Sequence, residues 1–148
     1  MENPKEELPA KKDPAKAVKE TVILVVEDND VDRKVVSTTL QRTGYKIETA
    51  QNGQEGLEKA LAVSPDIIIT DCEMPLMGGV EMCQKLKTSE AFKDIPVIFL
   101  TSIDTPQNII ECFEADAENF LTKPINAHVL LGHIETILET SEDILLDD

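Results

Sequence analysis

The sequence predicts a doubly wound α/β fold, a five-stranded parallel sheet with five helices on its two faces. Three observations predict it. Short apolar runs, too short for helices, recur along the chain. The most regular of them are apolar at every position, as strands covered on both faces are. All of these apolar runs alternate strictly with amphipathic helical patterns. This alternation requires parallel strands joined by right-handed crossovers.

Five runs are predicted as strands. Val22–Val26 is a continuous run of aliphatic, mostly β-branched residues, typical of a central parallel strand. Residues 45–50 alternate between apolar and polar, which indicates a strand nearer the edge. The remaining strands are predicted at residues 67–69, 95–100 and 120–121.

Helical patterns fill the intervals between these strands. Asp30 is placed to cap the first helix, which Gly44 would close. Thr105-Pro106 reads as a cap followed by proline at the first position of the fourth helix. The buried stripes of the first, second and last helices are assigned to Val31, Val35, Val36 and Leu40; to Leu57, Ala60 and Leu61; and to Leu130, Leu131, Ile134 and Leu138. The third helix follows residues 78–79.

Length and charge limit the class of protein. The chain has 148 residues, enough for one domain, and a formal net charge of −15 at pH 7. That charge would repel a phosphate backbone, and only 3% of the residues are aromatic, so no nucleic-acid partner is expected. The acidic surface has two interpretations, a solvated face or a face for a basic partner.

The ends of the chain are polar and differ from the segment between them. Residues 1–20 hold five Lys, five acidic residues and three prolines, which favours a disordered extension. Residues 141–148 are predicted as an acidic tail, leaving 21–140 as the folded domain. No signal peptide or membrane span is recognisable, and the three cysteines suit neither a disulfide framework nor a zinc site. A cytoplasmic location without a membrane partner is expected.

Polar residues follow four of the five predicted strands, at the sheet edge where functional crevices form. Glu27 and Asp28 follow the first strand, Asp71 the third, Thr101 the fourth and Lys123 the fifth. Three carboxylates held close together repel one another unless a cation lies among them. An all-oxygen set of this kind suits Mg²⁺.

These residue types together favour an aspartyl-phosphate site. Mg²⁺ would neutralise charge on a phosphoryl group that one carboxylate oxygen attacks. Thr101 could donate a hydrogen bond to one phosphoryl oxygen, and Lys123 could pair with another. Taken singly, each residue has an ordinary explanation as a helix cap, a strand-end hydroxyl or a solvated lysine.

Four segments carry a resemblance to a known family. They are VILVVEDN with Arg33 in the following helix, IIITDCEMPLMGG, VIFLTS and ADAENFLTKP. In this order and spacing the sequence resembles the receiver domain of bacterial two-component response regulators, the CheY-like superfamily, from residue 21 to about 140. The resemblance implies a flavodoxin-like architecture.

The resemblance also implies roles for single residues. Asp71 would be the phosphoacceptor, and Glu27, Asp28, Asp71 and the backbone carbonyl of Glu73 would bind Mg²⁺. Thr101 and Lys123 would be the switch hydroxyl and the phosphate-pairing lysine. Phe120 would be the aromatic switch residue that moves inward on activation, and a cis peptide would precede Pro124.

The implied function is a phosphoacceptor switch that is not an enzyme beyond transferring and losing its own phosphoryl group. A histidine kinase or histidine phosphotransfer protein would supply the phosphoryl group. A downstream effector would bind the face of the fourth helix, fifth strand and fifth helix, around residues 105–113, 120 and 126–138. No output domain follows, so the chain is expected to act alone or to be part of a longer regulator. Gly78 and Asp116 stand where the family often has Asp and Gly.

Alternatives remain at this stage. A phosphohydrolase of the haloacid dehalogenase type also uses an aspartyl phosphate, a hydroxyl, a lysine and Mg²⁺. A nucleotide or flavin binder is disfavoured because no glycine-rich loop follows the first strand. Cys72 is either a redox sensor or a small buried hydrophobe, and His128 and His133 are predicted at the surface.

Overall fold

The computed structural model describes residues 21–102, 110 and 119–146. Five parallel strands form one sheet in the order β2-β1-β3-β4-β5. The strands are β1 (Val22–Val26), β2 (Lys46–Ala50), β3 (Ile67–Thr70), β4 (Val97–Thr101) and β5 (Asn119–Thr122). The four described helices are α2 (Asp30–Arg42), α3 (Gly53–Val63), α4 (Gly79–Lys87) and α6 (Ala127–Leu146). The predicted doubly wound α/β fold is confirmed, and the helix expected after residues 105–106 lies outside the described residues, except for helical Ile110.

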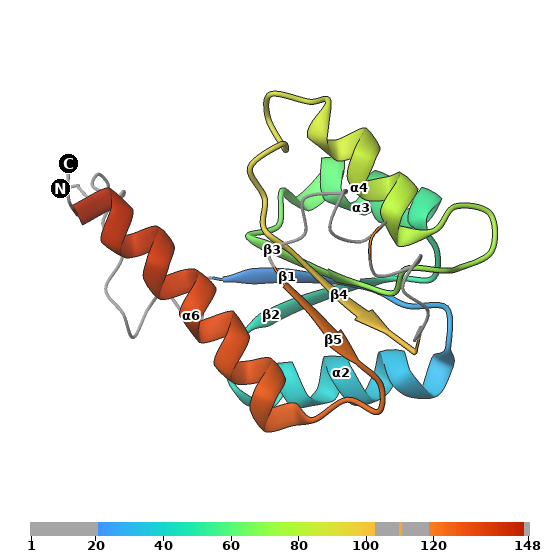
Figure 1. The fold of residues 1–148 in the computed structure, drawn as a ribbon, viewed down its shortest axis with the longest axis horizontal. Helices are drawn as coiled ribbons and strands as arrows, with labels where there is room; N and C mark the ends of the chain where they lie inside the picture. The colour runs from blue at the N-terminus through green and yellow to red at the C-terminus, as the bar shows by residue number, and fades with distance from the viewer. Residues whose placement is uncertain (1–20, 103–109, 111–118, 147–148) are drawn as a thin grey trace, which may run out of the picture.

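Helices cover both faces of the sheet. Helices α3 and α4 pack on one face and α2 and α6 on the other (Figure 1). Alternate side chains of each strand point to opposite faces, so Leu24 and Val26 enter the α3/α4 core while Ile23 and Val25 enter the α2/α6 core. This two-sided burial explains the continuous apolar runs. None of the helices in the described part of the chain has the length and apolar character needed to cross a lipid bilayer.

Helix α2 differs from its prediction. Its N-cap is Asn29, whose side chain accepts a hydrogen bond from the Asp32 backbone N–H. Val31 and Val35 are 70% and 50% exposed, whereas Val36 and Leu40 are buried. At 100° per residue the two pairs lie on nearly opposite sides of the helix, so they cannot share one buried stripe.

The predicted end of α2 is confirmed, whereas one residue of the predicted buried side of α3 is wrong. Gly44 follows α2 with φ 106, a conformation that favours glycine, and its N–H donates to the Gln41 carbonyl, as a helix stop should. Leu61 was assigned to the buried face of α3 and is instead 65% exposed, while Ala60 is buried. Asn52 caps α3 by accepting a hydrogen bond from the Glu55 backbone N–H.

Candidate functional site

The backbone brings the ends of β1 and β3 into register. The Asp71 N–H donates to the Val26 carbonyl at 3.0 Å, and the Glu27 N–H donates to the Ala50 carbonyl at 3.0 Å. The ladder hydrogen bonds thus extend one residue past both strands. Because parallel strands end at one edge of the sheet, Glu27 and Asp71 emerge there as neighbours.

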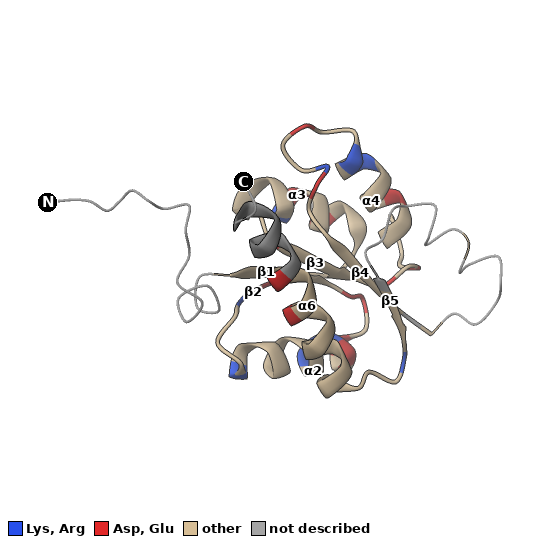
Figure 2. Cartoon of the chain, turned by 60° about the vertical axis from the view of Figure 1, so that its left-hand side comes forward, with Lys and Arg blue, Asp and Glu red and all other residues tan. Residues whose placement is uncertain are grey.

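Three carboxylates gather at this edge, as predicted from the strand ends. One oxygen each of Glu27, Asp28 and Asp71 lies within 4.8 Å of the other two. Glu27 and Asp71 are only 3% and 8% exposed, whereas Asp28 is exposed. Figure 2 shows Asp and Glu around the turn from β1 into α2.

Lys123 follows β5 and reaches into this cluster. Its Nζ lies 2.8 Å from Glu27 Oε1, 3.0 Å from Asp32 Oδ2 and 3.2 Å from Asp71 Oδ2. The lysine side chain is only 14% exposed. The peptide bond from Lys123 to Pro124 is cis, as the resemblance implied.

The charges shift the pKa values of two groups in the cluster. Burial raises the pKa of the Glu27 carboxyl, and the Asp71 carboxylate adds to the rise, although hydrogen bonds from Lys123 and the Asn29 N–H oppose it. Burial alone would lower the pKa of Lys123. Its carboxylate partners outweigh that cost, and the pKa of the ammonium ends above its ordinary value.

Local hydrogen bonds fix Glu27 from the α2 side. The Asn29 N–H donates to Glu27 Oε2 at 3.0 Å. Arg33 donates from one guanidinium nitrogen to the Glu27 carbonyl at 2.9 Å and pairs with Asp30 through the other. Arg33 was noted only as part of a motif, and the structure shows that it braces the backbone of the acidic turn.

The segment after Asp71 is held by close backbone contacts. The Thr70 hydroxyl donates to the Asp71 carbonyl at 2.9 Å, and the Gly79 N–H donates to the Cys72 carbonyl at 2.9 Å. A Cβ on Gly79 would lie 2.1 Å from the Asp71 carbonyl oxygen, so only glycine fits there. Leu76, at the turn of this loop, has φ 71 and is 87% exposed.

No contact with the carboxylate cluster is described for the other predicted site residues, Thr101, Phe120 and Glu73. Thr101 ends β4 and pairs with Thr122 in the ladder, but its side chain lies outside the described part. Phe120 is half-buried on the α3/α4 side and pairs with Phe99 in register. Glu73 is exposed, and its Cα lies beside Gly78.

Sequence reasoning missed Asp32. It lies in the first turn of α2, where one helical turn carries its carboxylate back toward the strand ends. The available signal was its position four residues after Asp28 on a helix that starts at this edge. Cys72 is buried within the α3/α4 core, as the hydrophobe interpretation predicted, while His128 is exposed and His133 half-buried.

The donor set fits a hard divalent cation. Oxygens of Glu27, Asp28 and Asp71 come together, and the Lys123 ammonium pairs with Glu27, Asp71 and Asp32, so among these described groups negative charge remains in excess. Carboxylate oxygens with an excess of negative charge are the kind of donor set that Mg²⁺ prefers.

Comparison with known proteins identifies the family. The family model described as the response regulator receiver domain matches residues 23–135. The solved signal receiver domain of a signal transduction histidine kinase from Syntrophus aciditrophicus superposes with a TM-score of 0.77 at 35% identity, covering 81% of this chain and 91% of its own. The protein is therefore a receiver-domain protein of two-component signalling, and it belongs to the response regulator receiver domain family.

Curated relatives include short and long proteins. Chemotaxis protein CheY1 of Helicobacter pylori is 33% identical over 122 residues, which are 81% of this chain and 98% of the relative. The DNA-binding dual master transcriptional regulator RpaA of Synechocystis is 32% identical over 122 residues, 82% of this chain and 51% of the relative. The chain thus spans nearly all of one relative and about half of the other.

Proposed function

We propose that the chain is a signalling switch whose phosphoacceptor is Asp71. The observation that carries the proposal is the juxtaposition of a nearly buried Asp71 carboxylate, a buried Glu27 carboxylate and the ammonium of Lys123 between them. This arrangement offers a nucleophilic oxygen, a cation for the phosphoryl oxygens and carboxylates for a metal. The family assignment supports it, because receiver domains are phosphoacceptor signalling domains.

The donor would be a phosphohistidine on a histidine kinase or a histidine phosphotransfer protein. An Asp71 carboxylate oxygen attacks phosphorus, a P–O bond forms and the P–N bond breaks, and the histidine nitrogen keeps the electron pair and takes a proton. Lys123 pairs with one phosphoryl oxygen, and Thr101 donates to another. Mg²⁺, held by Glu27, Asp28, Asp71 and the Glu73 carbonyl, would supply charge neutralisation on the phosphoryl group. Hydrolysis by water returns the carboxylate.

The conformational change caused by phosphorylation would pass from the site to the effector-binding face through β4 and β5. The phosphoryl group draws the Thr101 hydroxyl toward the site, and Phe120 moves toward the core, which changes the effector-binding face made by residues 105–113, β5 and α6. Phe120 is half-buried and lies next to β4 in the ladder, so a small shift of β4 reaches it. The phosphoryl group shifts this equilibrium only by its preference for the active arrangement, typically about 1–3 kcal/mol.

The wider assignments follow from the same proposal. We assign residues 21–140 to the receiver domain, 1–20 to an extension that phosphorylation does not need and 141–148 to an acidic tail, of which residues 141–146 continue helix α6. The charge of −15 disfavours a nucleic-acid or anionic membrane partner and suits a cytoplasmic protein that binds other proteins. The phosphohydrolase alternative would place its nucleophile after β1 and not after β3, and it predicts turnover of a small phosphate ester.

The test is phosphorylation by acetyl phosphate with Mg²⁺, followed by mapping of the adduct. Wild type and Asp30→Asn should carry one phosphoryl group on Asp71, because Asp30 is an exposed helix residue paired with Arg33. Asp71→Asn should carry none. An equal adduct on Asp71→Asn, or steady turnover of a small phosphate ester, would refute the assignment.

A further inference from the structure

We propose that Asp32 is a positioning residue that competes with the phosphoryl group for Lys123. The inference rests on the proposed function, because it concerns the same ammonium that would pair with a phosphoryl oxygen on Asp71. Asp32 belongs to α2 and Lys123 follows β5, and the two side chains meet at 3.0 Å.

The ammonium has no donor to spare. Lysine offers three N–H groups, and three carboxylates lie within 3.2 Å of Lys123 Nζ: those of Glu27, Asp32 and Asp71. A phosphoryl oxygen needs one of these donors. Lys123 must therefore weaken one carboxylate contact when the phosphoryl group arrives.

The solvent exposure of each carboxylate indicates which of the three contacts with Lys123 is weakened. Glu27 is 3% exposed, so water cannot replace its lysine contact, and a carboxylate has enough acceptor sites to keep that contact while it also binds Mg²⁺. Asp71 carries the phosphoryl group itself. The Asp32 side chain is 34% exposed, so water can replace the ammonium, and the N-terminal turn of α2 favours its negative charge.

Asp32 would therefore have two effects. Before phosphorylation it helps to hold Lys123 at the site edge between Glu27 and Asp71. During phosphorylation it opposes the transfer of the ammonium to the new anion. Neutralising Asp32 should tighten the binding of a phosphoryl mimic about two- to fivefold, the size expected for a partly exposed ion pair.

The experiment is a titration of the full chain with beryllofluoride in saturating Mg²⁺, followed by NMR. Asp32→Asn should show the tighter dissociation constant, and Asp32→Glu, which keeps a carboxylate, should return toward wild type. Asp30→Asn is the matched control. It removes one charge from the same helical turn, but Asp30 pairs with Arg33 and its side chain is 84% exposed.

A second readout separates competition from general electrostatics. Mg²⁺ affinity without beryllofluoride should change equally in Asp32→Asn and Asp30→Asn, because Asp32 competes for Lys123 and not for the metal. Equal beryllofluoride affinities in the two variants, or weaker binding by Asp32→Asn, would overturn the inference. If wild type neither binds beryllofluoride nor takes phosphate from acetyl phosphate, the proposed function fails instead.

Discussion

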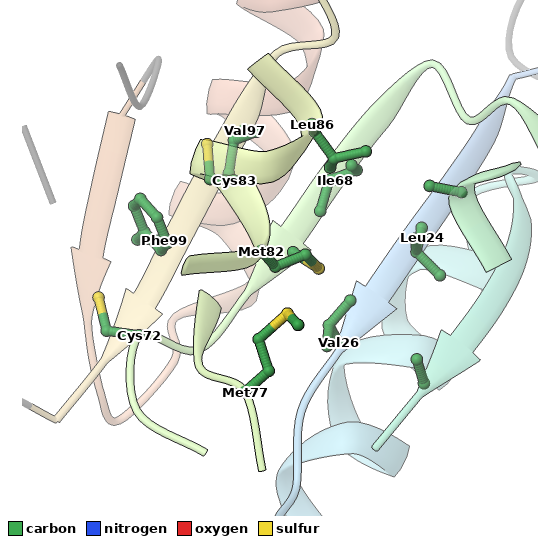
Figure 3. Close-up of a cluster of buried hydrophobic side chains, with 12 residues drawn as sticks. Leu24, Val26, Ile68, Cys72, Met77, Met82, Cys83, Leu86, Val97 and Phe99 are labelled. Atoms are coloured by element: carbon green, nitrogen blue, oxygen red, sulfur yellow. The ribbon is translucent and has the colours of Figure 1, made fainter. Parts of the chain in front are cut away.

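The two faces of the sheet are packed with different side chains. The α3/α4 core contains four buried sulfur-bearing residues, Cys72, Met77, Met82 and Cys83, together with Phe99 (Figure 3). The buried members of the α2/α6 core are aliphatic apart from Tyr45, and most of them are β-branched: Ile23, Val25, Val36, Ile67, Ile69, Ile98 and Ile134.

The faces also differ in what they touch. Cys72 and Met77 belong to the loop that follows Asp71, so the α3/α4 core is continuous with the candidate site. Thioether side chains adapt to small changes of shape, whereas β-branched side chains have few rotamers. We infer that the α3/α4 face adapts more readily to small displacements of the loop that follows Asp71, and that the α2/α6 face is the more rigid of the two.

Truncation of one core residue on each face tests most directly whether the two cores differ in rigidity. Ile69 and Met82 are both fully buried. We expect Ile69→Ala to lower the free energy of unfolding by about 3–5 kcal/mol and Met82→Ala by about 2–3 kcal/mol, because methionine and cysteine neighbours fill a cavity better. Urea unfolding followed by circular dichroism measures both. Equal losses would mean that the two cores are equally rigid.

A glycine-to-alanine substitution on each side of the sheet provides a second comparison of the two faces. Gly79→Ala places a methyl group 2.1 Å from the Asp71 carbonyl oxygen and should cost about 3 kcal/mol while slowing phosphorylation. Gly132→Ala, on α6, meets nothing within 4 Å and should raise the free energy of unfolding by about 0.5–1 kcal/mol through helix propensity. Thermal unfolding and the acetyl phosphate assay report both. A harmless Gly79→Ala would mean that the loop is not tightly held.

The acidic pair at the edge between the faces should serve the metal and not the fold. We expect Glu27→Gln with Asp28→Asn to abolish Mg²⁺-dependent phosphorylation. In metal-free buffer its free energy of unfolding should be unchanged or raised by up to about 1 kcal/mol, because burial and Asp71 disfavour the Glu27 carboxylate.

The control for this pair is Asp30→Asn with Glu58→Gln, which removes two charges from exposed helix positions. It should keep Mg²⁺-dependent phosphorylation. Unfolding of the Glu27/Asp28 double variant in metal-free buffer would instead make the pair structural.

The smallest expected effect tests the α2/α6 face at alkaline pH. Burial raises the pKa of the Tyr45 hydroxyl, and the Glu135 charge adds to the rise. The neutral form is thus favoured in the folded state, so stability is fully present below about pH 10 and falls as the pH rises beyond it. The part of the stability loss that comes from ionisation of Tyr45 should be absent in Tyr45→Phe and smaller in Glu135→Gln. The measurement is the urea midpoint of unfolding at pH 8 and at pH 11. An equal shift between these pH values in wild type, Tyr45→Phe and Glu135→Gln would argue against a role for Tyr45 in the decline.

The sequence was sufficient for the sheet and for most of the site because both depend on where apolar runs end. Glu27, Asp71 and Lys123 each follow such a run, so the topology alone brings them to one edge. The buried side of α2 was harder, because four aliphatic residues, Val31, Val35, Val36 and Leu40, offer two stripes. Only the angle at which the helix meets the sheet selects Val36 and Leu40.

The lysine–Asp32 contact could not be predicted for a related reason. An acidic residue in the first turn of a helix already has an explanation in the helix dipole and in solvation. Its contact with Lys123 depends on the path of the chain after β5, which no local pattern encodes. The side chain of Thr101 lies outside the described residues, so its predicted role stays a prediction.

The position of Lys123 has a consequence for how the chain acquires its structure. The ammonium contacts Asp32 across 91 residues of sequence and Asp71 across 52. A growing or truncated chain that ends before β5 would hold its cluster of carboxylates without their cation. Mutual repulsion would then keep the β1 and β3 loops apart until the last strand docks. The ammonium that we propose as the partner of a phosphoryl group would thus also make the whole domain more stable than an incomplete chain.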